Sequence, residues 1–72
     1  MDNSQVENLI GKKIKKLRQK NNLTQEKLAI KAGIPYTSLT KIESGVIKKP
    51  AVQTVAKIAK ALGISIDDLI KI

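Results

Sequence analysis

The side chains of this sequence that could act on another molecule are amines and hydroxyl groups. The 72 residues include no His and no Cys, so the commonest general base, the commonest zinc ligand and every thiolate ligand are missing. The six carboxylates offer no convincing pair, since Asp67 and Asp68 are sequence neighbours that cannot share one helix face. We therefore expect neither an enzyme nor a metal or cofactor site.

Lysine dominates the charge of the chain and is unevenly distributed. Fourteen Lys and Arg residues against six Asp and Glu residues give a net charge of +8. Residues 12–49 contain eleven of these cations and two acids, Glu26 and Glu43, a net charge of +9. Such a segment is either a solvated face or a surface for a polyanion, which could be DNA, RNA or an anionic membrane.

The aromatic content narrows these alternatives. The chain has one Tyr and neither Phe nor Trp, so single-stranded bases would find few rings to stack on. A membrane-surface helix would lack its usual anchors for the same reason. No stretch is long and apolar enough to span a membrane, and the absence of Cys predicts a cytoplasmic protein. Single-stranded nucleic acid and a membrane surface are therefore disfavoured as partners.

Apolar residues recur every three or four positions between single Gly and Pro residues, which predicts an all-α fold of five helices. We expect helices at about residues 6–20, 25–32, 36–44 and 51–62, and a short fifth helix capped by Ser65. Val52 is expected on the buried stripe of the fourth helix, and the lysines of the first helix are expected on a solvated face. Residues 1–7 are predicted to be a polar leader, and residues 8–72 one domain.

Residues 24–44 contain the most specific pattern. Thr24 is a natural N-cap, Gly33 can adopt the positive φ of a tight turn, and Ala29 is small where two helices would approach each other. The other apolar positions are Leu28, Ala32, Ile34, Leu39 and Ile42. This leaves hydrogen-bonding side chains on the outside of the helix at 36–44: Tyr36, Thr37, Thr40, Lys41 and Ser44. A helix with such a face suits the major groove of DNA.

The segment LTQEKLAIKAGIPYTSLTKIESG resembles the helix-turn-helix of the Cro and phage-repressor family, also called XRE-like. The resemblance continues through KKP and KIAKALGISIDDLI, and so covers about residues 9–70. It implies a compact five-helix, lambda-repressor-like domain that binds operators as a twofold dimer. It also implies a pair between Arg18 and Glu43 that bridges the first and third helices.

The resemblance assigns roles by position in this sequence. The residues that match base-reading positions are Tyr36, Thr37, Thr40 and Lys41. The residues that match phosphate-contact positions are Thr24, Gln25, Ser44, Lys48 and Lys49. The residues that match the helix-turn-helix framework are Leu28, Ala29, Gly33, Ile34, Leu39 and Ile42.

Some positions depart from the family pattern. Pro35 and Ala51 replace frequent side-chain caps of the third and fourth helices, and Tyr36 replaces a frequent Gln or Arg. A phenol cannot make the bidentate amide contact to adenine, so base preferences do not transfer from the family. The apolar residues near the C-terminus form either core contacts or a dimer seam: Ile64, Ile66, Ile70 and Ile72.

These observations predict a sequence-specific regulator of transcription that binds double-stranded DNA. The first hypothesis is a repressor that occupies a palindromic operator as a homodimer, and an activator of the small controller type fits the same sequence. The alternative from another class is an antitoxin-like module that binds a partner protein and, secondarily, DNA. An extra apolar surface or a partner-binding extension would favour that alternative.

Overall fold

Helices account for all the regular structure in residues 9–71, which are the residues that the computed structural model describes. The helices are α2 (Leu9–Lys20), α3 (Gln25–Ala32), α4 (Tyr36–Ser44), α5 (Val52–Leu62) and α6 (Ile66–Ile70). Their order confirms the predicted all-α fold of five helices, and α5 begins one residue later than expected. The predicted leader at 1–7, the predicted helical residues 6–8 and Ile72 lie outside the described residues.

Short turns with defined caps separate the helices. Thr24 caps α3, because its Oγ1 accepts a hydrogen bond of 3.1 Å from the N–H of Lys27. Ser65 caps α6 in the same way, whereas Pro35 and Ala51 make no side-chain cap, as the sequence predicted. Gly33 ends α3 at a φ of 71°, a left-handed conformation that other residues rarely adopt. The chain can therefore turn sharply from α3 into α4.

Every helix contributes at least one aliphatic side chain to a single core. The fully buried side chains, each less than 2% exposed, are Ile14, Leu28, Leu39, Ile42, Ile58 and Leu69. Removing one such side chain from water stabilises the fold by about 1.5–3 kcal/mol. Small residues of α3 and α5 are buried as well and let these two helices pack closely: Ala29, Ala32, Ala59 and Ala61.

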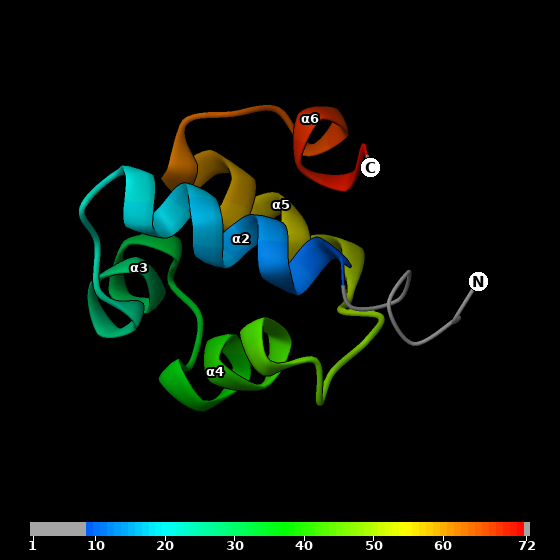
Figure 1. The fold of residues 1–72 in the computed structure, drawn as a ribbon, viewed down its shortest axis with the longest axis horizontal. Helices are drawn as coiled ribbons and strands as arrows, with labels where there is room; N and C mark the ends of the chain where they lie inside the picture. The colour runs from blue at the N-terminus through cyan, green and yellow to red at the C-terminus, as the bar shows by residue number, and fades with distance from the viewer. Residues whose placement is uncertain (1–8, 72) are drawn as a thin grey trace.

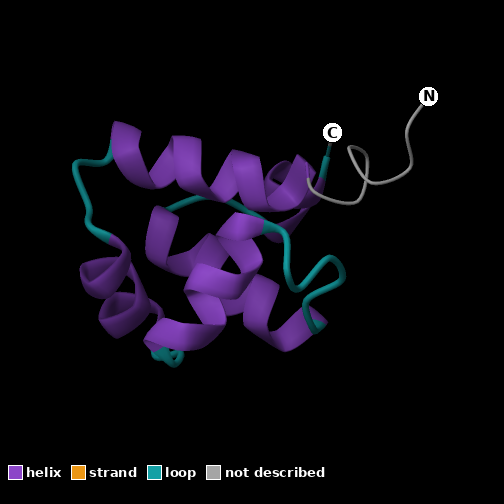
Figure 2. Cartoon of the chain, turned by 60° about the horizontal axis from the view of Figure 1, so that its bottom comes forward, coloured by secondary structure: helices purple, strands orange, loops and turns teal. Residues whose placement is uncertain are grey.

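The helix α2 lies across the molecule and holds three other helices. It packs against α4, α5 and α6, while α3 packs against α4 and α5. In Figure 1, α2 crosses the view with α3 and α4 below it and α6 above it. Figure 2 shows the loop between α4 and α5 at the same end of the molecule as the C-terminus. The helix α4 is thus held from one side by the rest of the domain.

Two positions differ from the sequence prediction. Val52 is 74% exposed rather than buried, because it lies in the first turn of α5 beside an open groove instead of a neighbouring helix. Lys13 is half-buried rather than fully solvated, and its Nζ donates to the backbone carbonyls of Asp68 and Lys71. Carbonyl groups at a helix C-terminus lack helical partners, so this amine ties α2 to the end of α6.

The burial of Ala29 makes a larger side chain costly at this position. Because Ala29 is 2% exposed, Ala29→Leu should overpack α3 against its neighbours and lower the free energy of unfolding by about 1–3 kcal/mol. Thermal unfolding followed by circular dichroism reports this as a drop in Tm of roughly 4–8 °C for each kcal/mol. Ala56→Leu, the same change at an exposed position of α5, is the control. Equal Tm values for wild type and A29L would contradict the packing described above.

Candidate nucleic-acid interface

The first turn of α3 offers backbone N–H groups at the molecular surface. Thr24 accepts from the N–H of Lys27, whereas the N–H groups of Gln25 and Glu26 have no acceptor among the described residues. The helix dipole is positive at this end, so these N–H groups suit a phosphate oxygen. The exposed hydroxyl of Thr24 accepts in its cap and still carries a proton to donate.

The outward face of α4 carries the four side chains predicted to read bases. Tyr36 is 51% exposed, Thr37 and Lys41 are exposed, and Thr40 is half-buried. Positions 36 and 40, like positions 37 and 41, are one helical turn apart, so the four side chains share one side of the helix. The opposite side of α4 carries its buried residues.

Two hydroxyl groups of α4 are already bonded to the backbone. Thr40 Oγ1 donates to the carbonyl of Thr37 at 2.8 Å, and Ser44 Oγ donates to the carbonyl of Lys41 at 3.2 Å. Each hydroxyl has one proton, so in this arrangement each can only accept a further bond. Ser44 must therefore release the Lys41 carbonyl before it can donate to a phosphate. The side chains of Tyr36, Thr37 and Lys41 donate no hydrogen bond within the described chain.

A buried ion pair fixes α4 against α2. Arg18 Nε lies 2.8 Å from Glu43 Oε2, and Arg18 Nη2 lies 3.0 Å from Glu43 Oε1, so the contact is bidentate. Arg18 Nη1 donates to the carbonyl of Leu23 at 2.7 Å. Arg18 is 8% exposed and Glu43 is 7% exposed. The predicted Arg18–Glu43 pair is confirmed, and it is shielded from water.

Gln25 joins this ion pair from the first turn of α3. Its Nε2 donates to Glu43 Oε1 at 3.1 Å, and the side chain is half-buried. An amide nitrogen carries two N–H groups, so one remains for a phosphate oxygen. Gln25 thus connects the predicted phosphate contact at α3 to the carboxylate that holds α4.

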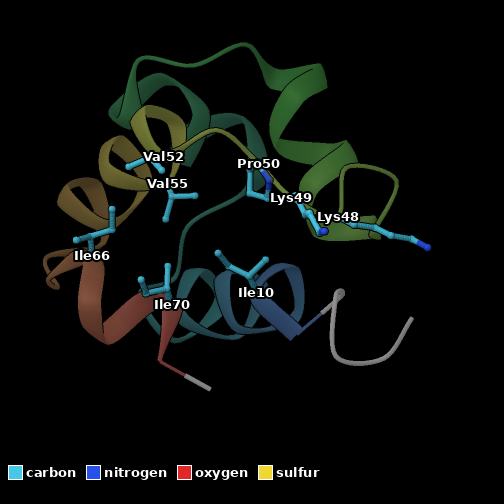
Figure 3. Close-up of a pocket in the computed structure, with 8 residues that line it drawn as sticks. All are labelled: Ile10, Lys48, Lys49, Pro50, Val52, Val55, Ile66 and Ile70. Atoms are coloured by element: carbon cyan, nitrogen blue, oxygen red, sulfur yellow. The ribbon is translucent and has the colours of Figure 1, made fainter. Parts of the chain in front are cut away.

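The loop between α4 and α5 carries the two lysines predicted to contact phosphates. Lys48 and Lys49 are exposed, and a hydrogen bond of 2.9 Å from the N–H of Ile47 to the carbonyl of Lys41 holds the loop against α4. Both lysines border an apolar groove of about 260 Å³, next to Pro50 (Figure 3). The loop therefore adds positive charge beside the end of α4.

The arrangement offers hydrogen-bond donors and positive charge to a binding partner. Within residues 9–71, no group of three or more His, Cys, Asp or Glu residues could hold a metal ion. None of the helices in this range is long and apolar enough to cross a membrane. The chemistry that these side chains support is the binding of an anionic surface that accepts hydrogen bonds.

Comparison with known proteins identifies the family that has this arrangement. A family model described as helix-turn-helix matches residues 14–69. The control protein C.BamHI of Bacillus amyloliquefaciens is 36% identical over 63 residues, which cover 86% of this chain and 76% of that protein. An uncharacterised helix-turn-helix-type transcriptional regulator of Methanocaldococcus jannaschii is 40% identical over 57 residues, which cover 79% of this chain and 85% of that protein. The chain belongs to the XRE-type helix-turn-helix family.

Two solved structures superpose closely on this XRE-type protein. The N-terminal DNA-binding domain of SinR from Bacillus subtilis gives a TM-score of 0.86 at 29% identity, over 90% of this chain and 94% of that domain. SinR in complex with SinI gives a TM-score of 0.83 at 31% identity, over 86% of this chain but 60% of that chain. The XRE-type protein is thus a member of a family of DNA-binding transcriptional regulators rather than enzymes, as the sequence predicted.

Sequence reasoning missed two contacts around the ion pair of the XRE-type protein. One is the bond from Gln25 to Glu43, and the other is the bond from Arg18 to the carbonyl of Leu23. A guanidinium has five N–H donors, and one carboxylate cannot accept all of them. That count indicates that a buried Arg needs a further acceptor, and it could have pointed to the bond from Arg18 to Leu23. No signal in the sequence indicated the bond from Gln25 to Glu43.

Proposed function

We propose that this XRE-type regulator is a repressor that binds a palindromic operator as a homodimer and acts in the cytoplasm. The observation that carries the proposal is the outward face of α4, where Tyr36, Thr37 and Lys41 are exposed and donate to no other described residue. Such a helix fits the major groove, where each base pair presents its own pattern of donors and acceptors. By occupying an operator within a promoter, the protein would exclude the polymerase.

We assign a contact with DNA to each of the four side chains on the outward face of α4 according to its chemistry. We assign Lys41 to guanine, because guanine O6 and N7 accept hydrogen bonds from an amine. Thr37 would donate to a base edge, whereas Thr40 would accept from an amino group while its own hydroxyl proton remains hydrogen-bonded to the Thr37 carbonyl. Tyr36 is assigned to a thymine methyl group or to a phosphate.

Phosphate contacts would position this face on the duplex without reading the sequence. We assign them to residues at the start of α3, at the end of α4 and in the loop that follows α4: Thr24, Gln25, Ser44, Lys48 and Lys49. Their support is proximity to α4, since Gln25 bonds to Glu43 of that helix and the loop after α4 bonds to the carbonyl of Lys41. Gln25 would bind a phosphate while keeping its bond to Glu43, so DNA contact and the position of α4 would be linked.

The homodimer has a candidate contact surface in the apolar groove. Of the residues predicted as dimer contacts, Ile64 and Ile66 are half-buried and pack on the core, whereas Ile70 is 48% exposed. Ile70 and the exposed Val52 both line the groove (Figure 3). Aliphatic side chains gathered at one surface favour burial against another protein, and a twofold contact brings the same patch from both copies. We therefore assign the dimer contact to this groove, with Ile70 and Val52 at its centre.

Two observations favour further candidates. The similarity to the control protein C.BamHI favours a regulator of the small controller type. A regulator of that type could be an activator, which is the variant that the sequence analysis left open. SinR, solved in complex with SinI, is a structural neighbour that binds a protein. The apolar groove of this chain is an extra apolar surface of the kind that a protein-binding module would need.

Selection of bound sequences from a random pool of duplex DNA at about 150 mM salt tests the proposal. We expect an inverted repeat with half-sites about one helical turn apart, because each copy of a twofold dimer places α4 in one major groove. A site without a repeat would contradict the dimer, and a pool with no enriched sequence would contradict base reading. A reporter gene with the selected site across its promoter then distinguishes a repressor, which lowers expression, from an activator.

Repeating the selection with Lys41→Ala connects the enriched sequence to α4. Loss of this amine should relax the preference at one base pair in each half-site and weaken the selected site by about 1–3 kcal/mol, with random duplex bound almost as before. The control is Lys16→Ala, at an exposed position of α2. Selection with this variant should enrich the same site as selection with the wild type. Equal losses on selected and random DNA would mean that Lys41 contacts a phosphate instead of a base.

A further inference from the structure

A hollow between α3 and α5 gathers three lysines that the proposed function does not use. It measures about 400 Å³ and is lined by Lys31 and Ala32 from α3 and by Lys57, Lys60 and Ala61 from α5. Lys57 and Lys60 are three positions apart and therefore share one side of α5. No lining residue belongs to α4 or to the loop at 45–51. The hollow is thus separate from the surface assigned to DNA.

The three amines have no counterion within the described chain. No hydrogen bond or ion pair joins Lys31, Lys57 or Lys60 to another described residue. The helix α5 contains no acidic residue, and Glu26, the acidic residue of α3, lies in the first turn, at the end opposite Lys31. Positive charge therefore converges on the hollow without an internal carboxylate to offset it.

Helix stabilisation accounts for only part of this charge. Lys31 and Lys60 lie in the last turns of their helices, where a cation offsets the negative end of the helix dipole. Each helix C-terminus carries only a partial negative charge, and Lys57 lies outside the last turn of α5. The positive charge at the hollow therefore exceeds what the helix ends offset, and it is available to an external anion.

We propose that this hollow binds a compact anion with adjacent phosphate groups, such as a diphosphate or a triphosphate. Each lysine supplies a point charge with three N–H donors, which suits a phosphate oxygen without demanding a fixed geometry. The two alanines of the lining are small and buried, so they leave room between the lysines. The lining contains no aromatic side chain for a nucleobase to stack on, so the anion is recognised by its phosphates.

Two sources can supply adjacent phosphates, a free oligophosphate and the backbone of DNA. The volume of the hollow lies within the range of small-molecule sites. Its lining shares no residue with the surface assigned to DNA. Both observations favour the free anion, and the inference therefore does not depend on the proposed function.

Titration calorimetry with inorganic tripolyphosphate, at about 50 mM salt so that screening is limited, tests the inference. The test variant carries Lys31→Gln, Lys57→Gln and Lys60→Gln. The control variant carries Lys12→Gln, Lys15→Gln and Lys16→Gln, which remove the same charge from exposed positions of α2. Circular dichroism establishes that both variants are folded, and anisotropy on a random duplex measures the DNA affinity of each.

We expect the Kd for tripolyphosphate to rise about tenfold or more in the test variant and to change much less in the control. The DNA affinity of the two variants should fall together, because only net charge is lost. If the test variant also binds DNA more weakly than the control variant does, the hollow binds phosphate groups and the DNA backbone is one source of them. Equal Kd values for tripolyphosphate in both variants would overturn the inference, whether or not DNA binding differs.

Discussion

The buried ion pair between Arg18 and Glu43 is the interaction on which the rest of the structure depends. Both groups lose their hydration inside the protein, which is unfavourable unless their remaining donors and acceptors find partners. Arg18 donates to both carboxylate oxygens and to the carbonyl of Leu23, and Gln25 donates to the same carboxylate. As a result α2, the turn before α3, the first turn of α3 and the end of α4 meet at one pair of charges. Removing either partner would leave the other charged and buried.

This constraint explains how a 72-residue chain can present a rigid helix to a partner. The helix α4 has 9 residues, too few to be stable by itself in water. Its inward side is held by the core and by Glu43, so its outward side is free to carry polar groups that contribute nothing to packing. Positive charge attracts DNA of any sequence, whereas a fixed row of donors discriminates between base pairs. Under the proposed function, the lysines of the loop after α4 would supply attraction and the outward face of α4 would supply discrimination.

Features with a local cause could be predicted from the sequence, and features that depend on distant segments could not. The caps at Thr24 and Ser65 and the turn at Gly33 are determined within a few residues, and the structure has all three. Periodicity placed Val52 on the stripe of α5 but could not tell whether another helix covers that end of the stripe. The contact of Lys13 with α6 depends on how α2 and α6 lie together. The base and phosphate contacts stay predictions, since they depend on a partner.

A double-mutant cycle on Arg18 and Glu43, measured by chemical unfolding, tests this account most directly. Arg18→Met and Glu43→Leu each leave one buried charge without its partner and should each lower the free energy of unfolding by about 3–5 kcal/mol. The double variant removes both charges, so the account predicts a loss far smaller than the sum of the two single losses. If a single variant is unfolded in buffer, the double variant should still fold. A double variant that loses the full sum would contradict the account, because the two residues would then act independently.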